Sequence, residues 1–239
     1  MPTIEPPRKK RPQGFSDEVV EDCLRIMASA SGKDLFEIIP RVGVLRDPRF
    51  FEPLTALLAH KDLKRREFAA YAMGAMGDRR FLEPLKKAFT EALALKGSHA
   101  EDLQVALVEA IGAIGDDRAV DFFMPTLGVP PGNRQERQIQ RWMLEALGSI
   151  AQQGGEASVA ALLELANQHQ VPELRAQAIM ELSVAYWHRP NKIPSRILLR
   201  ICESTRDQDT VVSESALAAL RSLADVGCRR AEMMFSDER

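Results

Sequence analysis

The sequence is poor in cysteine, and its three cysteines show no spacing that would suggest shared chemistry. Cys23, Cys202 and Cys228 lie far apart, form no CxxC pair and are odd in number. This pattern disfavours a disulfide framework or a zinc site and is typical of free thiols in a reducing compartment. We therefore expect a cytoplasmic protein without a metal site.

Long apolar runs and an excess of charge of one sign are also missing. No apolar stretch approaches the roughly 18 residues needed to span a bilayer, and residues 1–14 hold charges and prolines but nothing that resembles a secretory signal. The formal net charge of −2 disfavours a dedicated nucleic-acid or membrane-surface protein. The apolar fraction of 45% and the charged fraction of 28% are those of an ordinary folded chain.

Strand patterns are nearly absent, and apolar residues recur every three or four positions from about residue 16 onward, which predicts helices throughout. Comparison of the chain with itself finds one motif three times, over residues 72–78, 110–116 and 146–150. Its first glycine and the positions that align with it lie 31 to 38 residues apart: Gly43, Gly74, Gly112, Gly148, Ser183 and Arg221. This interval is typical of a two-helix repeat.

The register of the repeat is supported by apolar residues at fixed offsets from this glycine column. The position before the column is apolar in every unit: Val42, Met73, Ile111, Leu147, Leu182 and Leu220. The positions four residues before and two residues after the column are also apolar in every unit. Together these three positions form one stripe along a helix. A glycine inside a helix costs about 1 kcal/mol relative to alanine. Its recurrence therefore predicts that a neighbouring helix packs closely there.

An aspartate in the turn after this helix is expected to cap the next helix. It recurs at one offset, as Asp47, Asp78, Asp116 and Asp225, and a short carboxylate can accept hydrogen bonds from the first amides of a helix. We predict the other helix of each unit over residues 17–30, 48–60, 79–95, 118–127, 156–169 and 194–205.

The pattern resembles the HEAT-repeat superfamily, and within it the bacterial HEAT-like repeats first described in phycobilisome lyases. The resemblance rests on Arg66-x-x-Ala-Ala-x-Ala-Met-Gly-x-Met-Gly-Asp78, on residues 104–116 and on Arg175-Ala-x-Ala178. It implies an all-α fold, a right-handed α-α superhelix of about six helix pairs, as one domain over residues 16–239 behind a flexible basic tail over residues 1–15. Gly227-Cys-Arg-Arg230 echoes Gly77-Asp-Arg-Arg80 and predicts the start of a seventh unit.

Motifs for catalysis are missing. Deoxyhypusine hydroxylase, an enzyme of the superfamily, binds two irons through His-Glu pairs, but none of His60, His99, His169 and His188 is followed by glutamate. The Gly154-Gly155 turn lacks the lysine that follows the glycines of a phosphate-binding loop. We expect no enzymatic activity, no catalytic residue, no cofactor and no metal.

The concave face of such a superhelix would be formed by the glycine-bearing helices, and it predicts a surface for a protein partner. Residues at offsets −6, −3 and +1 form a ridge opposite the apolar stripe. It combines large aromatic residues with aligned glutamates on adjacent repeats, as in protein–protein hot spots. The predicted partner-binding residues are Phe68, Tyr71, Glu109, Arg141, Trp142, Glu145, Gln177 and Met180. In the alternative interpretation the aromatic residues only fill gaps between helices, which is also how we interpret Trp187.

A second cluster, at the starts of the same helices, is basic. It comprises Arg66, Arg134, Arg137 and Arg175 with the neighbouring Arg141. It is interpreted as a solvated rim paired with carboxylates, or as an edge for an acidic partner or, less favoured, for a phosphate backbone. The sequence thus predicts a cytoplasmic, bacterial scaffold or adaptor. The alternatives are a DNA-binding or alkylpurine-glycosylase-like protein that uses the basic rim, and an accessory factor related to phycobilin lyases.

Overall fold

The computed structural model describes residues 17–29 and 33–236, the last two by their backbone alone. Over these residues the chain forms α-helices and short 3-10 helices and no strand. The α-helices are α1 (Asp17–Ser29), α2 (Lys33–Glu37), α3 (Ile39–Leu45), α4 (Phe51–Leu58), α5 (Leu63–Met76), α6 (Leu82–Ala92), α7 (Ser98–Ile114), α8 (Val120–Leu127), α9 (Arg134–Gln152), α10 (Glu156–Gln168), α11 (Pro172–Val184), α12 (Ser195–Ser204), α13 (Thr210–Asp225) and α14 (Arg229–Ser236). The tail predicted over residues 1–15 lies outside the described residues.

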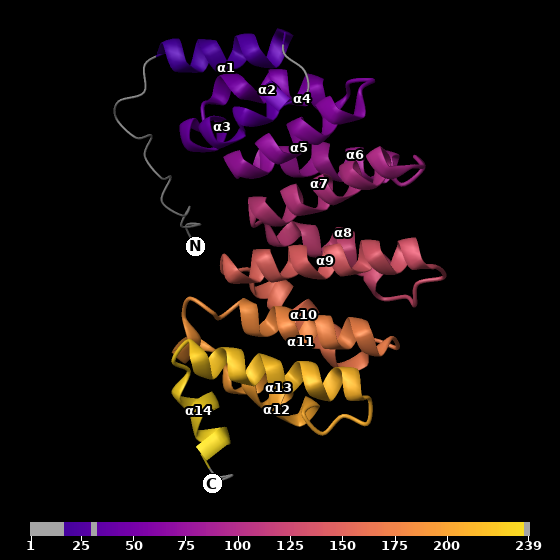
Figure 1. The fold of residues 1–239 in the computed structure, drawn as a ribbon, viewed down its shortest axis with the longest axis vertical. Coiled ribbons are helices and arrows are strands. Elements are labelled where there is room, and N and C mark those ends of the chain that lie inside the picture. The colour runs from indigo at the N-terminus through magenta and orange to yellow at the C-terminus, as the bar shows by residue number, and fades with distance from the viewer. Residues whose placement is uncertain (1–16, 30–32, 237–239) are drawn as a thin grey trace, which may run out of the picture.

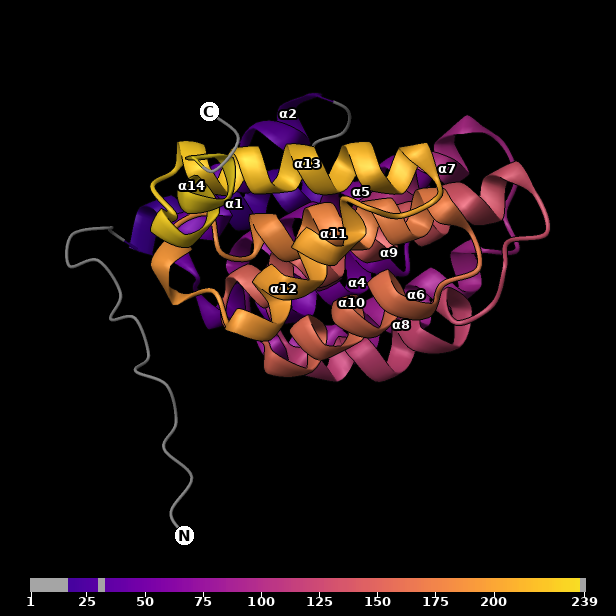
Figure 2. The same ribbon diagram turned by 90° about the horizontal axis from the view of Figure 1, so that it is seen from below.

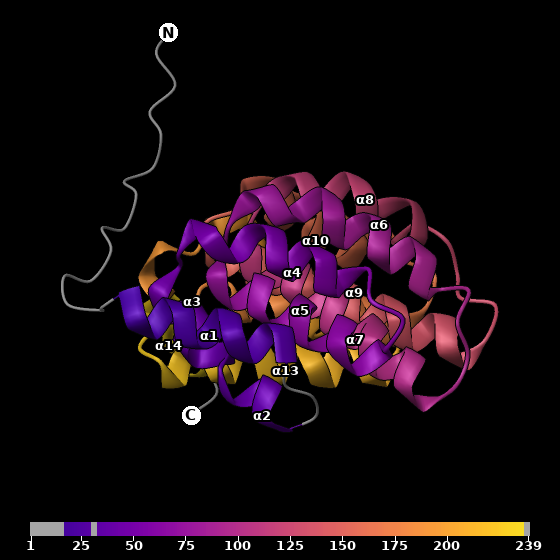
Figure 3. The same cartoon turned by 90° about the horizontal axis from the view of Figure 1, so that it is seen from above.

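The helices stack in pairs into an all-α solenoid, as predicted (Figure 1). We call α1, α4, α6, α8, α10 and α12 the A helices, and α3, α5, α7, α9, α11 and α13 the B helices. Each B helix from α5 to α13 packs against the B helix before it. The A helices from α4 to α12 lie along one side of the stack and the B helices along the other, while α1 packs on the end of the stack against α2, α3 and α4. The stack curves with the B helices on its inner side (Figures 2 and 3). No helix in the part of the chain that the structure describes is long and apolar enough to cross a membrane.

Neighbouring B helices approach each other closely at the glycine column. A Cβ atom added to Gly74 would lie 2.9 Å from the Cα atom of Ala110, and one added to Gly112 would lie 2.9 Å from the Cα atom of Ala146. Backbone atoms at that distance leave no room for a side chain. The packing reason predicted for the recurrent glycine is confirmed.

The predicted aspartate caps are confirmed at three of the four positions. Asp47, Asp78 and Asp116 each accept a hydrogen bond, of 3.0 to 3.1 Å, from the backbone amide two residues later. These amides open the 3-10 helices Pro48–Phe50, Arg79–Phe81 and Asp117–Ala119, which lead into α4, α6 and α8. The prediction is wrong for Asp225, because α13 continues through this residue. Near the start of α14 the amide of Arg229 instead donates to Asn191 Oδ1 at 3.3 Å.

The first B helix departs from the pattern. It is divided into α2 and α3, and Pro40 is the second residue of α3. A proline lacks an amide proton and is tolerated only in the first turn of a helix, so a new helix has to begin near it. The separate α2 lies beside α5 and, as shown below, covers part of the predicted binding ridge.

Candidate functional site

The predicted ridge lies on the inner side of the B helices, and its members differ in exposure. The Glu109, Arg141 and Glu145 side chains are exposed to solvent. The Tyr71, Trp142, Gln177 and Met180 side chains are partly buried. These residues belong to α5, α7, α9 and α11, four successive helices of the inner layer. We call them the inner-face cluster.

Phe68 does not belong to this surface, although the sequence predicted it there. Its side chain is 0% exposed, and its ring meets the ring of Phe36 edge to face with centroids 6.0 Å apart. Phe36 comes from α2, which the division of the first B helix brings over the start of α5. Tyr71 also contacts Phe36, with centroids 6.5 Å apart, but stays partly exposed. Phe68 is therefore a core residue.

The surroundings of Tyr71 are acidic. Burial and, after it, the nearby carboxylates of Glu109, Glu67 and Asp102 raise the pKa of the Tyr71 hydroxyl to about 12. A phenol beside several carboxylates resists ionisation because its anion would be repelled. The hydroxyl is thus a hydrogen-bond donor at any physiological pH.

The acidic character continues across the next two B helices. Although the Glu145 side chain reaches solvent, the surrounding protein removes part of the hydration of its carboxyl group and raises its pKa; Arg141 opposes this shift and Glu109 adds to it. The pKa of Glu181 is raised to about 7, because burial and the charge of Glu145 raise it by more than the hydrogen bond from Gln177 lowers it. The charge of Glu109 on α7 thus acts on Glu145 of α9, and the charge of Glu145 acts on Glu181 of α11.

The prediction from sequence missed Glu181 as a site residue. It stands where Ala110 and Ala146 occur in two preceding units, and its side chain is 8% exposed. Gln177 Nε2 donates a 2.6 Å hydrogen bond to Glu181 Oε1, and the carboxyl group lies over Gly148, where an added Cβ atom would meet Oε2. The signal in the sequence was a glutamate in a column of alanines.

A cavity of about 550 Å³ opens beside Trp142, between α7 and α9. Val105 and Trp142 provide its apolar wall, Glu101 and Asp102 lie on the α7 side, and Arg134 lies on the α9 side. Two partly buried apolar side chains next to charged groups suit a side chain that has both an apolar stem and a charged end.

One part of the chain matches a known family. Residues 65–91 match the family profile described as PBS lyase HEAT-like repeat. The match begins in α5, crosses the Asp78 turn and ends in α6, so it covers one B helix and the A helix after it. Residues 65–91 therefore resemble one HEAT-like repeat, within a solenoid whose other helix pairs stack in the same way. No curated protein matches it significantly.

The basic rim is largely paired with carboxylates. Arg137 lies 3.5 Å from Glu173, Arg66 lies 3.7 Å from Glu91, and Arg175 lies 3.6 Å from Asp207. Arg134 differs, because it lines the cavity beside Trp142 and a neighbouring cavity of about 540 Å³. The pairing leaves few cations of the rim available to a phosphate backbone.

Two further findings concern residues outside the inner-face cluster. Among the residues that the structure describes, no group of three or more histidine, cysteine, aspartate or glutamate side chains is placed to hold a metal ion. Trp187, which we interpreted as a packing residue, is 47% exposed. That interpretation is wrong because α11 ends at Val184 and Trp187 lies in the connection to α12.

Proposed function

We propose that this protein is a non-catalytic scaffold that binds a basic segment of a protein partner on its inner face. The observation that carries the proposal is the arrangement on three successive B helices, where partly buried Tyr71 and Trp142 flank the exposed Glu109. Tyrosine and tryptophan at the centre of a patch are the residue types that contribute most to binding energy at protein interfaces.

The carboxylates on the inner face favour a positively charged partner. Glu109 raises the pKa of Glu145, and Glu145 raises the pKa of Glu181; Glu101 and Asp102 line the cavity beside Trp142. Lys64 is already engaged, at 2.8 Å from Glu67 and 3.1 Å from Asp102. Lysine or arginine side chains of a partner would relieve this repulsion and could lie on the aromatic rings.

The proposal is tested by affinity capture with variants of matched residue type. Trp142→Ala and Tyr71→Ala should each weaken partner capture at least about tenfold, because each removes an aromatic anchor. Trp187→Ala is the control, since it removes an exposed tryptophan outside the inner-face cluster. Capture is quantified by mass spectrometry, and circular dichroism checks that each variant keeps its helices.

Two results would contradict the proposal. One is capture that stays unchanged in both inner-face variants while their helical content is preserved. The other is tight binding of the protein to duplex DNA with a steep decrease as salt rises, which would assign the function to cations of the rim instead.

A further inference from the structure

The connection between α11 and α12 forms one wall of a second cavity. Most turns from a B helix to the next A helix are short, as between α5, which ends at Met76, and the 3-10 helix that begins at Arg79. The connection from Val184 to Ser195 is longer and contains the 3-10 helix Pro190–Lys192. Together with the turn between α9 and α10 it encloses a cavity of about 330 Å³. Long connections in a compact fold often carry function.

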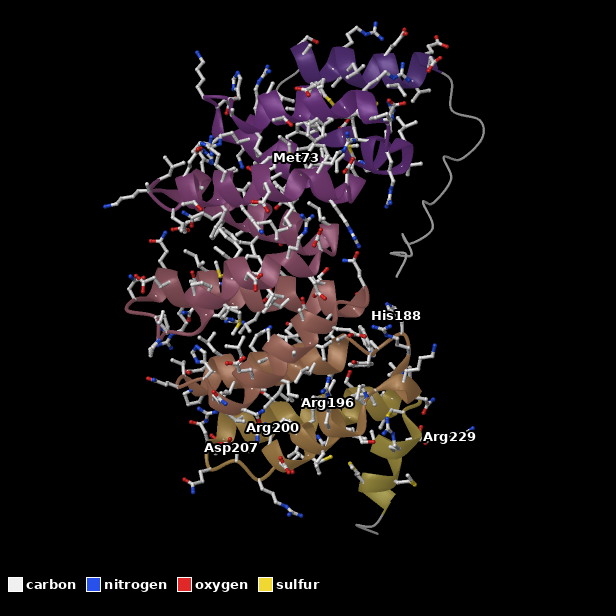
Figure 4. The ribbon with its side chains drawn as sticks, turned by 180° about the vertical axis from the view of Figure 1, so that it is seen from behind. Met73, His188, Arg196, Arg200, Asp207 and Arg229 are labelled. Carbon is white, nitrogen blue, oxygen red and sulfur yellow. The ribbon has the colours of Figure 1, made fainter. Side chains whose placement is uncertain are left out.

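Three cations line this cavity: Arg189, Lys192 and Arg196. Figure 4 shows Arg196 on α12, with His188 in the connection that precedes this helix. Among the ion pairs of the described residues, none involves any of the three cations. Glu156 is the carboxylate in the lining. Among the lining residues, three positive charges against one negative charge leave an excess of two; the Asp117 carboxylate lies behind Gly155 and is held by the amides of Ala157 and Ser158.

Tyr186 and Arg189 belong to the lining of the cavity and contact each other. The Arg189 guanidinium lies 5.5 Å from the centre of the Tyr186 ring, and its Nη2 atom donates a 3.2 Å hydrogen bond to the carbonyl of Ala151. Its Nε atom is buried and has no hydrogen-bond partner. A buried donor without an acceptor is costly unless something supplies one.

The glycine turn between α9 and α10 is the opposite wall. The sequence shows no lysine after Gly154-Gly155, but the fold brings Lys192 of the next repeat to the same cavity. The turn's own amides are occupied, because Gly154 N donates to Ala151 O and Gly155 N to Ile150 O. Asp117 occupies the amides of Ala157 and Ser158 at the start of α10. An anion would therefore be held by side chains and not by the helix terminus.

We propose that this cavity binds a small phosphorylated molecule through its phosphoryl group. The excess of two positive charges matches a phosphoryl dianion, and arginine guanidinium groups suit its tetrahedral oxygens. The volume is at the lower end of the range for small-molecule sites. This site is separate from the inner-face cluster and does not depend on the function proposed for it.

The experiment measures thermal unfolding of the full chain in inorganic phosphate, with sodium chloride of equal ionic strength as the reference. The mid-transition temperature should rise by about 3 °C or more at about 10 mM phosphate, because a ligand that binds only the folded state stabilises it. In the double variant Lys192→Ala, Arg196→Ala the rise should disappear. Both side chains are exposed, so the variant keeps its fold.

The control variant is Lys87→Ala, which removes an exposed lysine of α6. It should respond to phosphate as the unmodified protein does. Titration calorimetry should find at least tenfold weaker phosphate binding in the double variant than in the control. An equal rise in temperature in the double variant and in the unmodified protein would overturn the proposal, since general salt exclusion would then account for the effect. No rise in the unmodified protein would overturn it as well.

Discussion

At the scale of single residues, Glu181 is the most unusual group on the inner face. The carboxyl group has lost most of its contact with water, and its polar partner is the Gln177 amide. An ionised carboxylate in such a place is destabilised, because neither the amide nor the nearby Glu145 replaces the lost hydration. The folded protein therefore favours the protonated form of Glu181.

This preference predicts a dependence of stability on pH. The pKa of Glu181 is about 7 in the folded state against 4.5 for an ordinary glutamate. Its contribution to stability is thus fully present below about pH 4.5 and is lost as the pH rises through about 7, up to about 3 kcal/mol in total. Glu181→Gln keeps the shape without the charge, so it should be more stable than the unmodified protein at pH 8.

Urea unfolding at pH 5 and at pH 8 measures this difference. The advantage of Glu181→Gln over the unmodified protein should be small at pH 5 and grow by about 1 to 3 kcal/mol at pH 8. An advantage that is the same at both values would mean that Glu181 does not titrate in this range.

Residues of the inner face could be predicted from sequence where a regular helix alone decides their exposure. Glu109 and Glu145 occupy one offset in two regular units, and both are exposed as expected. Phe68 has an equally good offset, but its exposure depends on α2, whose position follows from the proline break in another unit. Glu181 is buried because Gly148 of the preceding unit leaves space for its side chain. The burial of Phe68 and Glu181 depends on residues of another repeat unit. It therefore could not be predicted by aligning equivalent positions of the repeats.

At the scale of helices, consecutive aspartates serve two different units. Asp116 caps the 3-10 helix that begins at the next residue. Asp117 extends across the repeat interface to α10, where it accepts 3.0 Å hydrogen bonds from the amides of Ala157 and Ser158 and one of 2.8 Å from the Ser158 hydroxyl. The residue that precedes α10 is Gly155, which has no side chain with which to cap the helix. Asp117 of the preceding unit therefore provides the N-terminal cap of α10.

Asp117→Ala should therefore destabilise the protein by about 1 to 2 kcal/mol, as expected for the loss of an N-terminal cap. Asp121→Ala, an exposed aspartate of α8, is the matched control and should change stability by less than about 0.5 kcal/mol. Chemical denaturation gives both values. Hydrogen exchange should also become faster at Ala157 and Ser158 in Asp117→Ala alone; equal exchange in both variants would show that the cap is dispensable.

The bounds of the helices were predictable to within a few residues where turns have clear chemistry. Residues 156–169 were expected as a helix and α10 covers Glu156–Gln168. The connection after α11 was less predictable, because its path depends on contacts of Asn191 and Arg189 with other units. These long-range contacts also bring Lys192 to the glycine turn.

At the scale of the whole molecule, the stack is held by contacts between neighbouring units. In such a solenoid, stability is close to a sum of units and of the interfaces between them. The interface of α7 with α9 is central in the chain, and Gly112 sets its separation. A Cβ atom there would lie 2.9 Å from Ala146 Cα, 3.0 Å from Ala146 Cβ and 3.2 Å from the Ala146 carbonyl oxygen.

Gly112→Ala tests whether this separation governs the molecule. Helix propensity alone would stabilise the variant by about 1 kcal/mol. The clash is with backbone atoms that cannot rotate away, so we expect a net destabilisation of about 1 to 3 kcal/mol in chemical denaturation. Gly132→Ala is the control, because an added Cβ atom there meets only the flexible carboxylate of Glu136.

The same substitution connects the architecture with the proposed function. If α9 has to move away from α7, Trp142 and Glu145 move relative to Glu109, and the cavity between these helices changes shape. Partner capture by Gly112→Ala should then fall under conditions where the variant is still folded, while Gly132→Ala binds as the unmodified protein does. Unchanged stability and capture in Gly112→Ala would show that the repeats adjust to a wider spacing, and the glycine column would then have no part in shaping the inner face.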